Sequence, residues 1–181
     1  MELVWIPGLP GIQALGGWVG KYEVTQEQYM KVMGENPSEF KGNDRLPVEK
    51  LSWSNAREFC SRLTDREKQI GRLKGDDSYT LPTAEQWKMF VADALTNATI
   101  AVYNASKTAP VGSKGPNQFG LYDVQGNVRE WIMPKDNQCQ FIGASYNSQV
   151  LLTSSWVLVQ SSTASRTEPY IGFRCICLAS P

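Results

Sequence analysis

The sequence predicts a single α+β domain, because capped helical segments occupy its first half and short β-prone pieces separated by turns occupy its second. Its 181 residues can bury a sizeable core and suit one ordinary domain, 1–181. The helical period disappears after Thr96, where Gly, Ser, Asn and Pro recur every few residues. We therefore expect a loop-rich domain with two to three helices and short antiparallel strands.

Each predicted helix begins at a residue that can cap it. The Thr-x-x-Gln pairs at 25–28 and 83–86 predict capping boxes, and Gly34 predicts the end of the first helix. Another helix is expected from near Ser52 to Gly71, because its apolar residues recur at i, i+3, i+4 and i+7.

The expected strands are short apolar or β-branched runs bounded by turn residues. They are 3–6, 19–24, 100–103, 119–122, 141–142, 156–159 and 171–177.

Charge and composition exclude several classes of protein. The 18 Lys and Arg residues balance 18 Asp and Glu residues, which argues against binding to nucleic acid or to an anionic membrane. No run of about 18 apolar residues predicts a membrane span, and no signal peptide is predicted. The absence of histidine excludes imidazole metal sites and Ser-His-Asp or Cys-His catalysis.

The four cysteines do not form a recognisable framework. Their spacing fits neither a zinc site nor a dense set of disulfides, so we expect core or surface thiols. They are Cys60, Cys139, Cys175 and Cys177.

Eight short motifs occur in an order that is informative, although each alone is weak. They include Gly-Asn-Val-Arg-Glu-Trp at 126–131, Gly-Ala-Ser-Tyr at 143–146 and Gly-Phe-Arg at 172–174. The others lie at 4–8, 20–25, 47–60, 79–87 and 117–123. The ordered set resembles the formylglycine-generating enzyme family, the sulfatase-modifying variety of the C-type lectin fold. The resemblance runs from residue 3 to about 177.

Most residues of these motifs are expected to be structural. Large rings should fill the core at Trp53, Trp87 and Trp131. Turns or close packing should require Gly120, Gly126 and Gly172. Arg174 should bond buried carbonyl groups or a carboxylate, with Glu130 as the candidate.

The resemblance identifies the positions where catalytic residues would be found. Enzymes of this family use two cysteines, five residues apart, after the Gly-Gly-Ser-Tyr/Trp motif to bind copper and oxidise a substrate cysteine. The corresponding residues here are Ser148 and Thr153, and hydroxyls cannot replace thiolates as ligands of Cu(I). A second branch uses a histidine-held iron to form carbon–sulfur bonds. The lack of histidine in this chain excludes that chemistry unless another domain supplies the ligands. We expect no enzymatic activity.

The C-terminal region also resembles the variable region of lectin-fold proteins from diversity-generating retroelements, which presents a ligand-binding surface. The region concerned is about 133–174. Within it, the segment 146–165 is rich in Ser and Thr and contains no charged side chain, as is typical of adaptable recognition surfaces with aromatic anchors. The expected ligand-binding residues are Tyr146, Asn147, Ser148, Gln149, Leu151, Ser154, Trp156, Gln160, Thr163, Thr167 and Tyr170. For Leu151 and Trp156, a place in the core is the alternative.

One candidate cation site accompanies the Gly-Asn-x-x-Glu-Trp turn. The resemblance implies calcium held by side-chain and main-chain oxygens, which suit a hard cation. The residues concerned are Asp123, Gly126, Val128 and Glu130. In the alternative, Asp123 caps the turn and Glu130 pairs with Arg174 or Arg129. No other cofactor is required.

The predicted function is non-enzymatic binding of a protein or glycan ligand, with no nucleic acid and no membrane span involved. The alternatives are an enzyme of the family, such as the sulfatase-modifying oxidase, and an accessory domain of a signalling protein. The sequence does not fix the compartment. Display on a virion or on a cell surface is an expectation.

Overall fold

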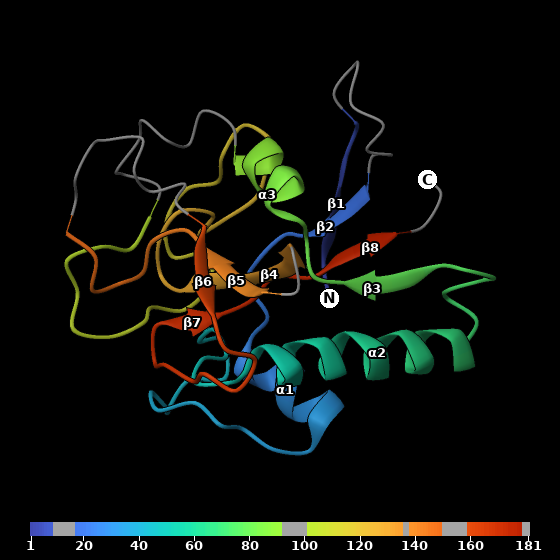
Figure 1. Ribbon diagram of the computed structural model, residues 1–181, viewed down its shortest axis with the longest axis horizontal. Helices are drawn as coiled ribbons and strands as arrows, with labels where there is room; N and C mark the ends of the chain where they lie inside the picture. The colour runs from blue at the N-terminus through green and yellow to red at the C-terminus, as the bar shows by residue number, and fades with distance from the viewer. Residues whose placement is uncertain (9–16, 92–100, 136–137, 150–158, 179–181) are drawn as a thin grey trace.

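The computed structural model contains two four-stranded sheets with helices packed against them (Figure 1). It describes residues 1–8, 17–91, 101–135, 138–149 and 159–178. In the first sheet the strand order is β1-β2-β8-β3, and every pair is antiparallel. Its strands are Leu3–Ile6 (β1), Gly17–Gly20 (β2), Ile176–Leu178 (β8) and Ser78–Thr80 (β3).

The second sheet has the order β6-β5-β4-β7 and is mixed, because β4 pairs with β7 in parallel. Its strands are Gln160–Ser162 (β6), Gln138–Ile142 (β5), Arg129–Lys135 (β4) and Ile171–Gly172 (β7). Three residues, 173–175, separate β7 from β8, so the chain passes directly from one sheet to the other.

Helices α1 (Gln26–Met33), α2 (Trp53–Gln69) and α3 (Ala84–Val91) begin where the sequence predicts. Both capping boxes are confirmed. Gln28 N donates to Thr25 Oγ1 over 3.3 Å, while Thr25 N donates to the Gln28 side chain over 3.1 Å. The residues at 83–86 form the same reciprocal pair. None of the helices in the described part of the chain combines the length and apolarity needed to cross a bilayer.

The strand alternation of β4 and β5 sends side chains into two separate apolar clusters. Trp131 and Phe141 pack with α1 and α2 in one cluster, whereas Ile132 and Ile142 pack with Trp87 of α3 in the other. The two strands are therefore buried on both faces where these four residues lie. Trp87 and Trp131 are core residues as predicted, and Trp53 is half-buried at the border of the first cluster.

Two predicted strands, 100–103 and 119–122, are wrong in their described residues, which form turns and bends. Asn117 explains the second error. Its side-chain oxygen accepts from Phe119 N and Leu121 N, and Gly120 between them has a positive φ of 79°. The apolar residues there are buried by a loop that folds over the core, not by a sheet.

The remaining strand predictions are partly right. Residues 21–24 are not in a strand, and the predicted strand 171–177 is split because Phe173 O and Cys175 O accept from Val24 N and Gly20 N between β7 and β8. β3, β4 and β6 were not predicted. Residue 159 lies outside any strand, and 156–158 lie outside the described residues.

Candidate functional site

The loop 143–149 follows β5 and is built on a tight turn around Ser145. Ser145 N donates to Ser148 Oγ over 3.1 Å, Ser148 N donates to Ser145 O over 2.9 Å, and Ser145 Oγ lies 2.8 Å from Asn147 Oδ1. Ser145 is buried, and its main-chain and side-chain hydrogen bonds stabilise the turn. Asn147 and Gln149 are exposed, and Ser148 is half-buried with its hydroxyl engaged in the turn.

The predicted exposure of Tyr146 is wrong: its side chain is only 6% exposed. The ring packs edge-on against Phe40, with 5.4 Å between centroids. Tyr146 N donates to Asn127 O, and Tyr146 O accepts from Ala105 N, both over 2.8 Å. These bonds fix the backbone of Tyr146 while its ring packs inward against Phe40, so Tyr146 anchors the loop. Burial raises the pKa of its hydroxyl.

The other predicted ligand-binding residues that the structure describes come from β6 and the loop after it. Gln160, Thr163 and Thr167 are exposed, and Tyr170 is half-buried. Figure 1 places this segment and the loop 143–149 on the same side of the molecule, around the sheet β6-β5-β4-β7. The predicted residues Leu151, Ser154 and Trp156 lie outside the described residues.

The Gly-Phe-Arg motif, which was expected to be part of the scaffold, is buried. Gly172 is packed so closely that a Cβ would lie 2.4 Å from Val48 O. Phe173 and Arg174 have no exposed surface. The prediction that Arg174 bonds buried carbonyl groups and Glu130 is confirmed.

The four predicted cation ligands lie at the buried turn, but several of their groups have other partners. Glu130 accepts from Arg174 on Oε1 and from Trp87 Nε1 on Oε2. Asp123 Oδ2 accepts from Gly112 N over 2.6 Å. Gly126 lies so close to Val102 O that a Cβ would be 2.6 Å away.

Val128 is the fourth predicted cation ligand, and its main-chain N–H donates to the carboxylate of Glu23. Glu23 is buried at this turn, and the sequence analysis did not identify it as part of the site. Burial, and then the charges of Asp123 and Glu130, raise the pKa of Glu23. Within the described residues, no group of three or more Cys, Asp or Glu side chains has the arrangement to hold a metal ion. Calcium at this turn stays a prediction.

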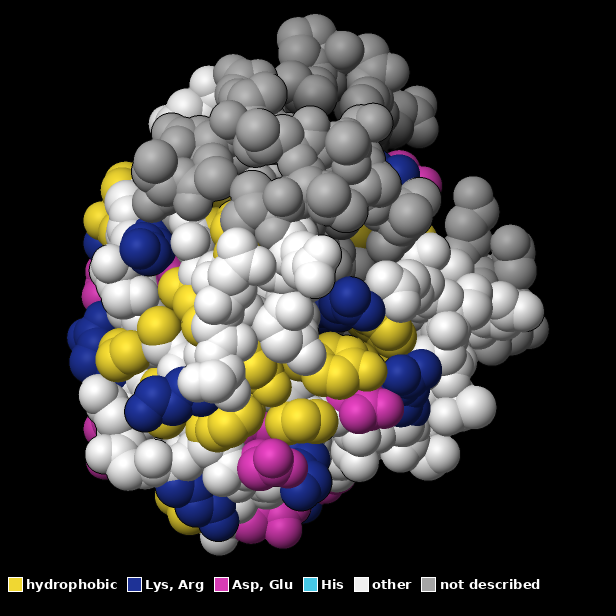
Figure 2. Space-filling model, turned by 90° about the vertical axis from the view of Figure 1, so that its left-hand side faces the viewer, with side chains coloured by type: hydrophobic (Ala, Val, Ile, Leu, Met, Phe, Trp, Pro, Cys, Tyr) yellow, Lys and Arg dark blue, Asp and Glu magenta, His cyan; other side chains and the backbone are white. Residues whose placement is uncertain are grey.

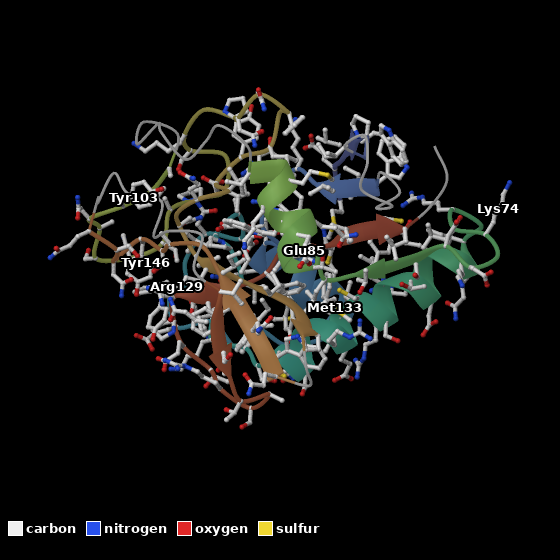
Figure 3. All side chains as sticks on the ribbon, turned by 45° about the horizontal axis from the view of Figure 1, so that its top comes forward. Lys74, Glu85, Tyr103, Arg129, Met133 and Tyr146 are labelled. Carbon is white, nitrogen blue, oxygen red and sulfur yellow. The ribbon has the colours of Figure 1, made fainter. Side chains whose placement is uncertain are left out.

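Arg129 and Arg166 form a second feature that sequence reasoning did not identify. Arg129 begins β4, and Arg166 lies in the loop between β6 and β7. Their guanidinium groups both lie over the ring of Phe141, and Figure 3 labels Arg129 and Tyr146 on the same side of the molecule. Arg129 is visible in the sequence as the arginine of the Gly-Asn-Val-Arg-Glu-Trp motif. The motif alone does not show which residues the arginine contacts.

The cysteines are free thiols, as predicted. Sγ of Cys60 lies 3.5 Å from Sγ of Cys175 in the core, and burial raises the pKa of Cys175 well above its ordinary value. A buried thiol that holds its proton is a poor nucleophile and a poor metal ligand. Neither residue lies in the loop 143–149.

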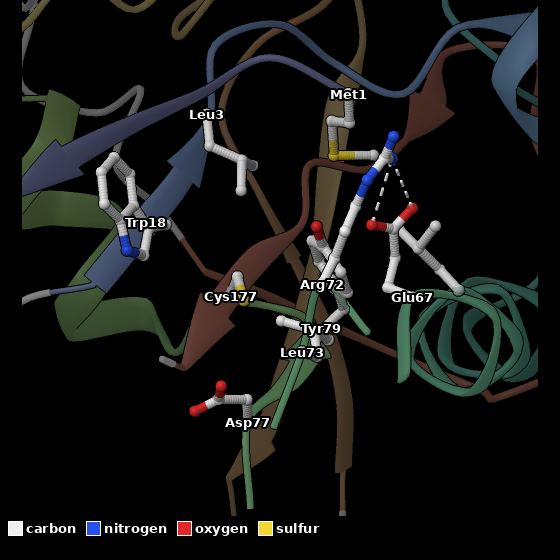
Figure 4. Close-up of a pocket in the computed structure, with 10 residues that line it drawn as sticks. Met1, Leu3, Trp18, Glu67, Arg72, Leu73, Asp77, Tyr79 and Cys177 are labelled. Atoms are coloured by element: carbon white, nitrogen blue, oxygen red, sulfur yellow. Dashed lines mark hydrogen bonds and ion pairs between the residues drawn. The ribbon is translucent and has the colours of Figure 1, made fainter. Parts of the chain in front are cut away.

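A cavity of about 420 Å³ lies on another part of the molecule, between the first sheet and the end of α2 (Figure 4). Leu3, Trp18 and Tyr79 line it, and the ion pair between Arg72 and Glu67 closes one side. None of the predicted ligand-binding residues lines this cavity.

The sequence matches the sulfatase-modifying factor enzyme 1-like domain over residues 12–179. It is 31% identical over 170 residues to the chaperone protein LppX of Paenibacillus barcinonensis, which covers 63% of this chain and 60% of that protein. It is 23% identical over 168 residues to the inactive C-alpha-formylglycine-generating enzyme 2 of Bos taurus, covering 72% of this chain and 50% of that protein. The chain spans half to three-fifths of the length of these two relatives.

Solved structures share the fold at low sequence identity. Treponema denticola variable protein 1 has a TM-score of 0.75 and 21% identity, with 97% of this chain and 94% of that chain covered. CarF has a TM-score of 0.69 and 22% identity, with 97% and 93% covered. PvdO from Pseudomonas aeruginosa has a TM-score of 0.67 and 21% identity, with 91% and 81% covered.

Proposed function

Because the chain belongs to the sulfatase-modifying factor enzyme 1-like family and has its C-type lectin fold, we propose that it is a member that binds a ligand without catalysing a reaction. The expectations of family and fold drawn from the ordered motifs are confirmed. Similarity to an inactive formylglycine-generating enzyme is in keeping with the proposal.

The chemistry of the loop 143–149 supports the absence of oxidase activity. Ser148 stands at the first of the two positions that carry copper-binding cysteines in the enzymes, and its hydroxyl is hydrogen-bonded within the turn. A neutral hydroxyl does not bind Cu(I) as a thiolate does. The second position, Thr153, also has a hydroxyl in place of a thiol.

The observation that carries the binding proposal is the contrast between the loops and the scaffold beneath them. Asn147, Gln149 and Thr167 are exposed and uncharged, whereas Ser145 and Phe173 are fully buried. Side chains can vary without cost to folding where they do not hold the core. Small polar side chains on such loops suit hydrogen bonding to different ligands.

The architecture of Treponema denticola variable protein 1 supports a further step in the proposal. We expect the region 133–174 to be the variable part of the protein, with the buried motif residues fixed. The ligand is then a protein or a glycan that differs between copies of the gene.

The experiment compares two double variants on glycan and peptide arrays. Gln149→Ala with Thr167→Ala removes two exposed side chains of the proposed surface. The matched control, Gln69→Ala with Ser61→Ala, removes the same kinds of side chain from the exposed side of α2. Both should melt within a few degrees of wild type, because exposed substitutions usually change stability by less than about 0.5 kcal/mol.

Only the first double variant should lose binding to the array ligands that wild type recognises. Equal binding by the two double variants, or the absence of any array ligand for wild type, would contradict the proposed surface.

A further inference from the structure

Two guanidinium groups lie over one phenyl ring on the sheet β6-β5-β4-β7. Cζ of Arg129 and Cζ of Arg166 are each 5.7 Å from the centroid of Phe141. Arg129 Cζ is also 5.4 Å from the centroid of Tyr170, whose hydroxyl accepts from Arg166 Nη2 over 3.1 Å. Two like charges that share the same aromatic partners repel each other, so this arrangement favours the binding of negative charge.

The described residues leave this cluster with one positive charge in surplus. Glu168 pairs with Arg166 over 3.2 Å, and Arg129 forms no ion pair within the described chain. The neighbouring segment 146–165 has no acidic residue, so it cannot supply the missing carboxylate.

The donors of Arg129 are incompletely used. Nη1 donates to the neutral side chain of Gln160 over 3.2 Å. Nε is buried and has no hydrogen-bond partner in the described residues, and the same is true of Ser162 Oγ. A charged donor without an acceptor is costly, so a carboxylate placed next to this half-buried guanidinium would be bound with a net gain.

Strand register places these groups on one face of the sheet. Phe141 is the cross-strand partner of both Trp131 and Gln160, and Arg129 lies two residues before Trp131 on the same side of β4. The space-filling view of this side of the molecule shows hydrophobic side chains across its middle, with basic and acidic side chains next to them (Figure 2). Arg129 donates to Gln160 and lies over the ring of Tyr170, so the cluster adjoins residues proposed to bind the ligand.

We propose that Arg129 and Arg166 bind a carboxylate group of an acidic peptide segment in the partner. The proposal rests on the binding function proposed above and specifies what the surface recognises. A planar guanidinium binds the two oxygens of a carboxylate side by side. A surplus of one positive charge matches a monovalent carboxylate better than a divalent phosphate.

A peptide is favoured over an acidic sugar by the position of β6. β6 is the last strand of its sheet and pairs only with β5 within the described residues. The free edge of such a strand can receive an extended peptide through main-chain hydrogen bonds, which would hold an acidic side chain near Arg129.

The test follows the Nε–H resonances of Arg129 and Arg166 by NMR in the ¹⁵N-labelled chain at constant ionic strength. The probe is the end-blocked peptide Gly-Glu-Gly, with Gly-Gln-Gly as its uncharged match. Glucuronate and inorganic phosphate are titrated separately. We expect the glutamate peptide to shift both resonances to saturation and the glutamine peptide to leave them unchanged.

Arg129→Lys should weaken the binding seen at Arg166 Nε about ten-fold or more, because lysine cannot present two parallel donors. Arg166→Lys, at an exposed position, provides the reciprocal measurement at Arg129 Nε if the first variant folds poorly. Arg57→Lys is the matched control: Arg57 is half-buried, its Cζ lies 5.7 Å from the Trp53 ring, and its Nη1 already donates to Thr80.

Equal shifts with both peptides, unchanged affinity in the lysine variants, or saturation only by glucuronate or phosphate would each overturn the proposal. These results are separable from failure of the binding function. If the carboxylate peptide does not bind but Gln149→Ala with Thr167→Ala still abolishes array binding, the surface stands and the carboxylate site is rejected.

Discussion

Nε of Arg174 donates to Oε1 of Glu130 over 3.1 Å in the interior of the protein, where both residues are essentially inaccessible to solvent. Nη1 and Nη2 of Arg174 donate to Gly20 O and Tyr122 O over 2.8 and 2.7 Å. Glu130 belongs to β4 and Gly20 to β2, so this single side chain connects the two sheets. Both charged groups are removed from water, so the loss of either one leaves the other buried without a counter-ion.

Arg174→Met should therefore reduce the free energy of unfolding by about 3–5 kcal/mol, because it leaves the Glu130 carboxylate buried without its counter-ion. Urea unfolding measures the loss. The matched control is Arg62→Met, which removes an exposed ion pair with Glu58 and should cost less than about 1 kcal/mol. Equal losses in the two variants would show that the buried pair has no special role.

Gly172→Ala should destabilise the protein by about 2 kcal/mol or more, because the new Cβ would lie 2.4 Å from Val48 O and 2.9 Å from Val128 Cγ2. A main-chain oxygen cannot move aside without shifting the loop that carries it. Gly17→Ala is the control, since its Cβ would meet only Cys177 O at 3.6 Å. Thermal melting should separate the two variants clearly. A Gly172→Ala protein as stable as Gly17→Ala would contradict the close packing.

Local signals explain which parts of the fold could be predicted. A helix cap depends on residues three positions apart, so the boxes at 25–28 and 83–86 could be read directly from the sequence. β4 was missed because it begins with two charged residues and contains Pro134. Its pairing with β5 and β7 depends on residues farther along the chain, which a local pattern does not reveal.

The candidate site was predictable in position but not in detail. The change in composition after residue 145 located the loops, and Asn147 and Gln149 are exposed as expected. Tyr146 was assigned to the surface because an aromatic residue among polar ones is typical of a binding loop, yet Phe40 provides a partner for its ring. Arg129 was missed because its contacts with Phe141 and Tyr170 are created only by folding.

The protein should not oxidise the cysteine of a sulfatase-derived peptide in the presence of copper and oxygen. Ser148 and Thr153 offer hydroxyls where Cu(I) needs two thiolates, and Cys60 and Cys175 are buried elsewhere. Thiol titration and mass spectrometry of the peptide measure the outcome. A catalytically active member of the family is the positive control. Conversion of the peptide cysteine to formylglycine above the level seen without protein would show that the protein is an oxidase of this family.

Glu49 should make the stability of the protein depend on pH. Its side chain is fully buried; Oε1 accepts from Phe40 N over 2.9 Å, while Oε2 has no partner within the described residues. Burial raises the pKa of Glu49 from 4.5 to about 7. The folded protein thus holds this proton to higher pH than the unfolded chain does. The contribution of the group is fully present below about pH 4.5 and is lost as pH rises to about 7.

Glu49→Gln should remove this dependence, because an amide stays neutral and can still accept from Phe40 N. Between pH 4.5 and 7, the free energy of unfolding of wild type should fall relative to the variant by up to roughly 3 kcal/mol, the equivalent of the change in pKa. Urea unfolding at several pH values gives the difference curve, in which the contributions of other buried carboxylates such as Glu23 cancel. The control is Glu39→Gln, whose exposed carboxylate pairs with Lys50. A wild-type curve parallel to that of Glu49→Gln would show that folding does not raise the pKa of Glu49.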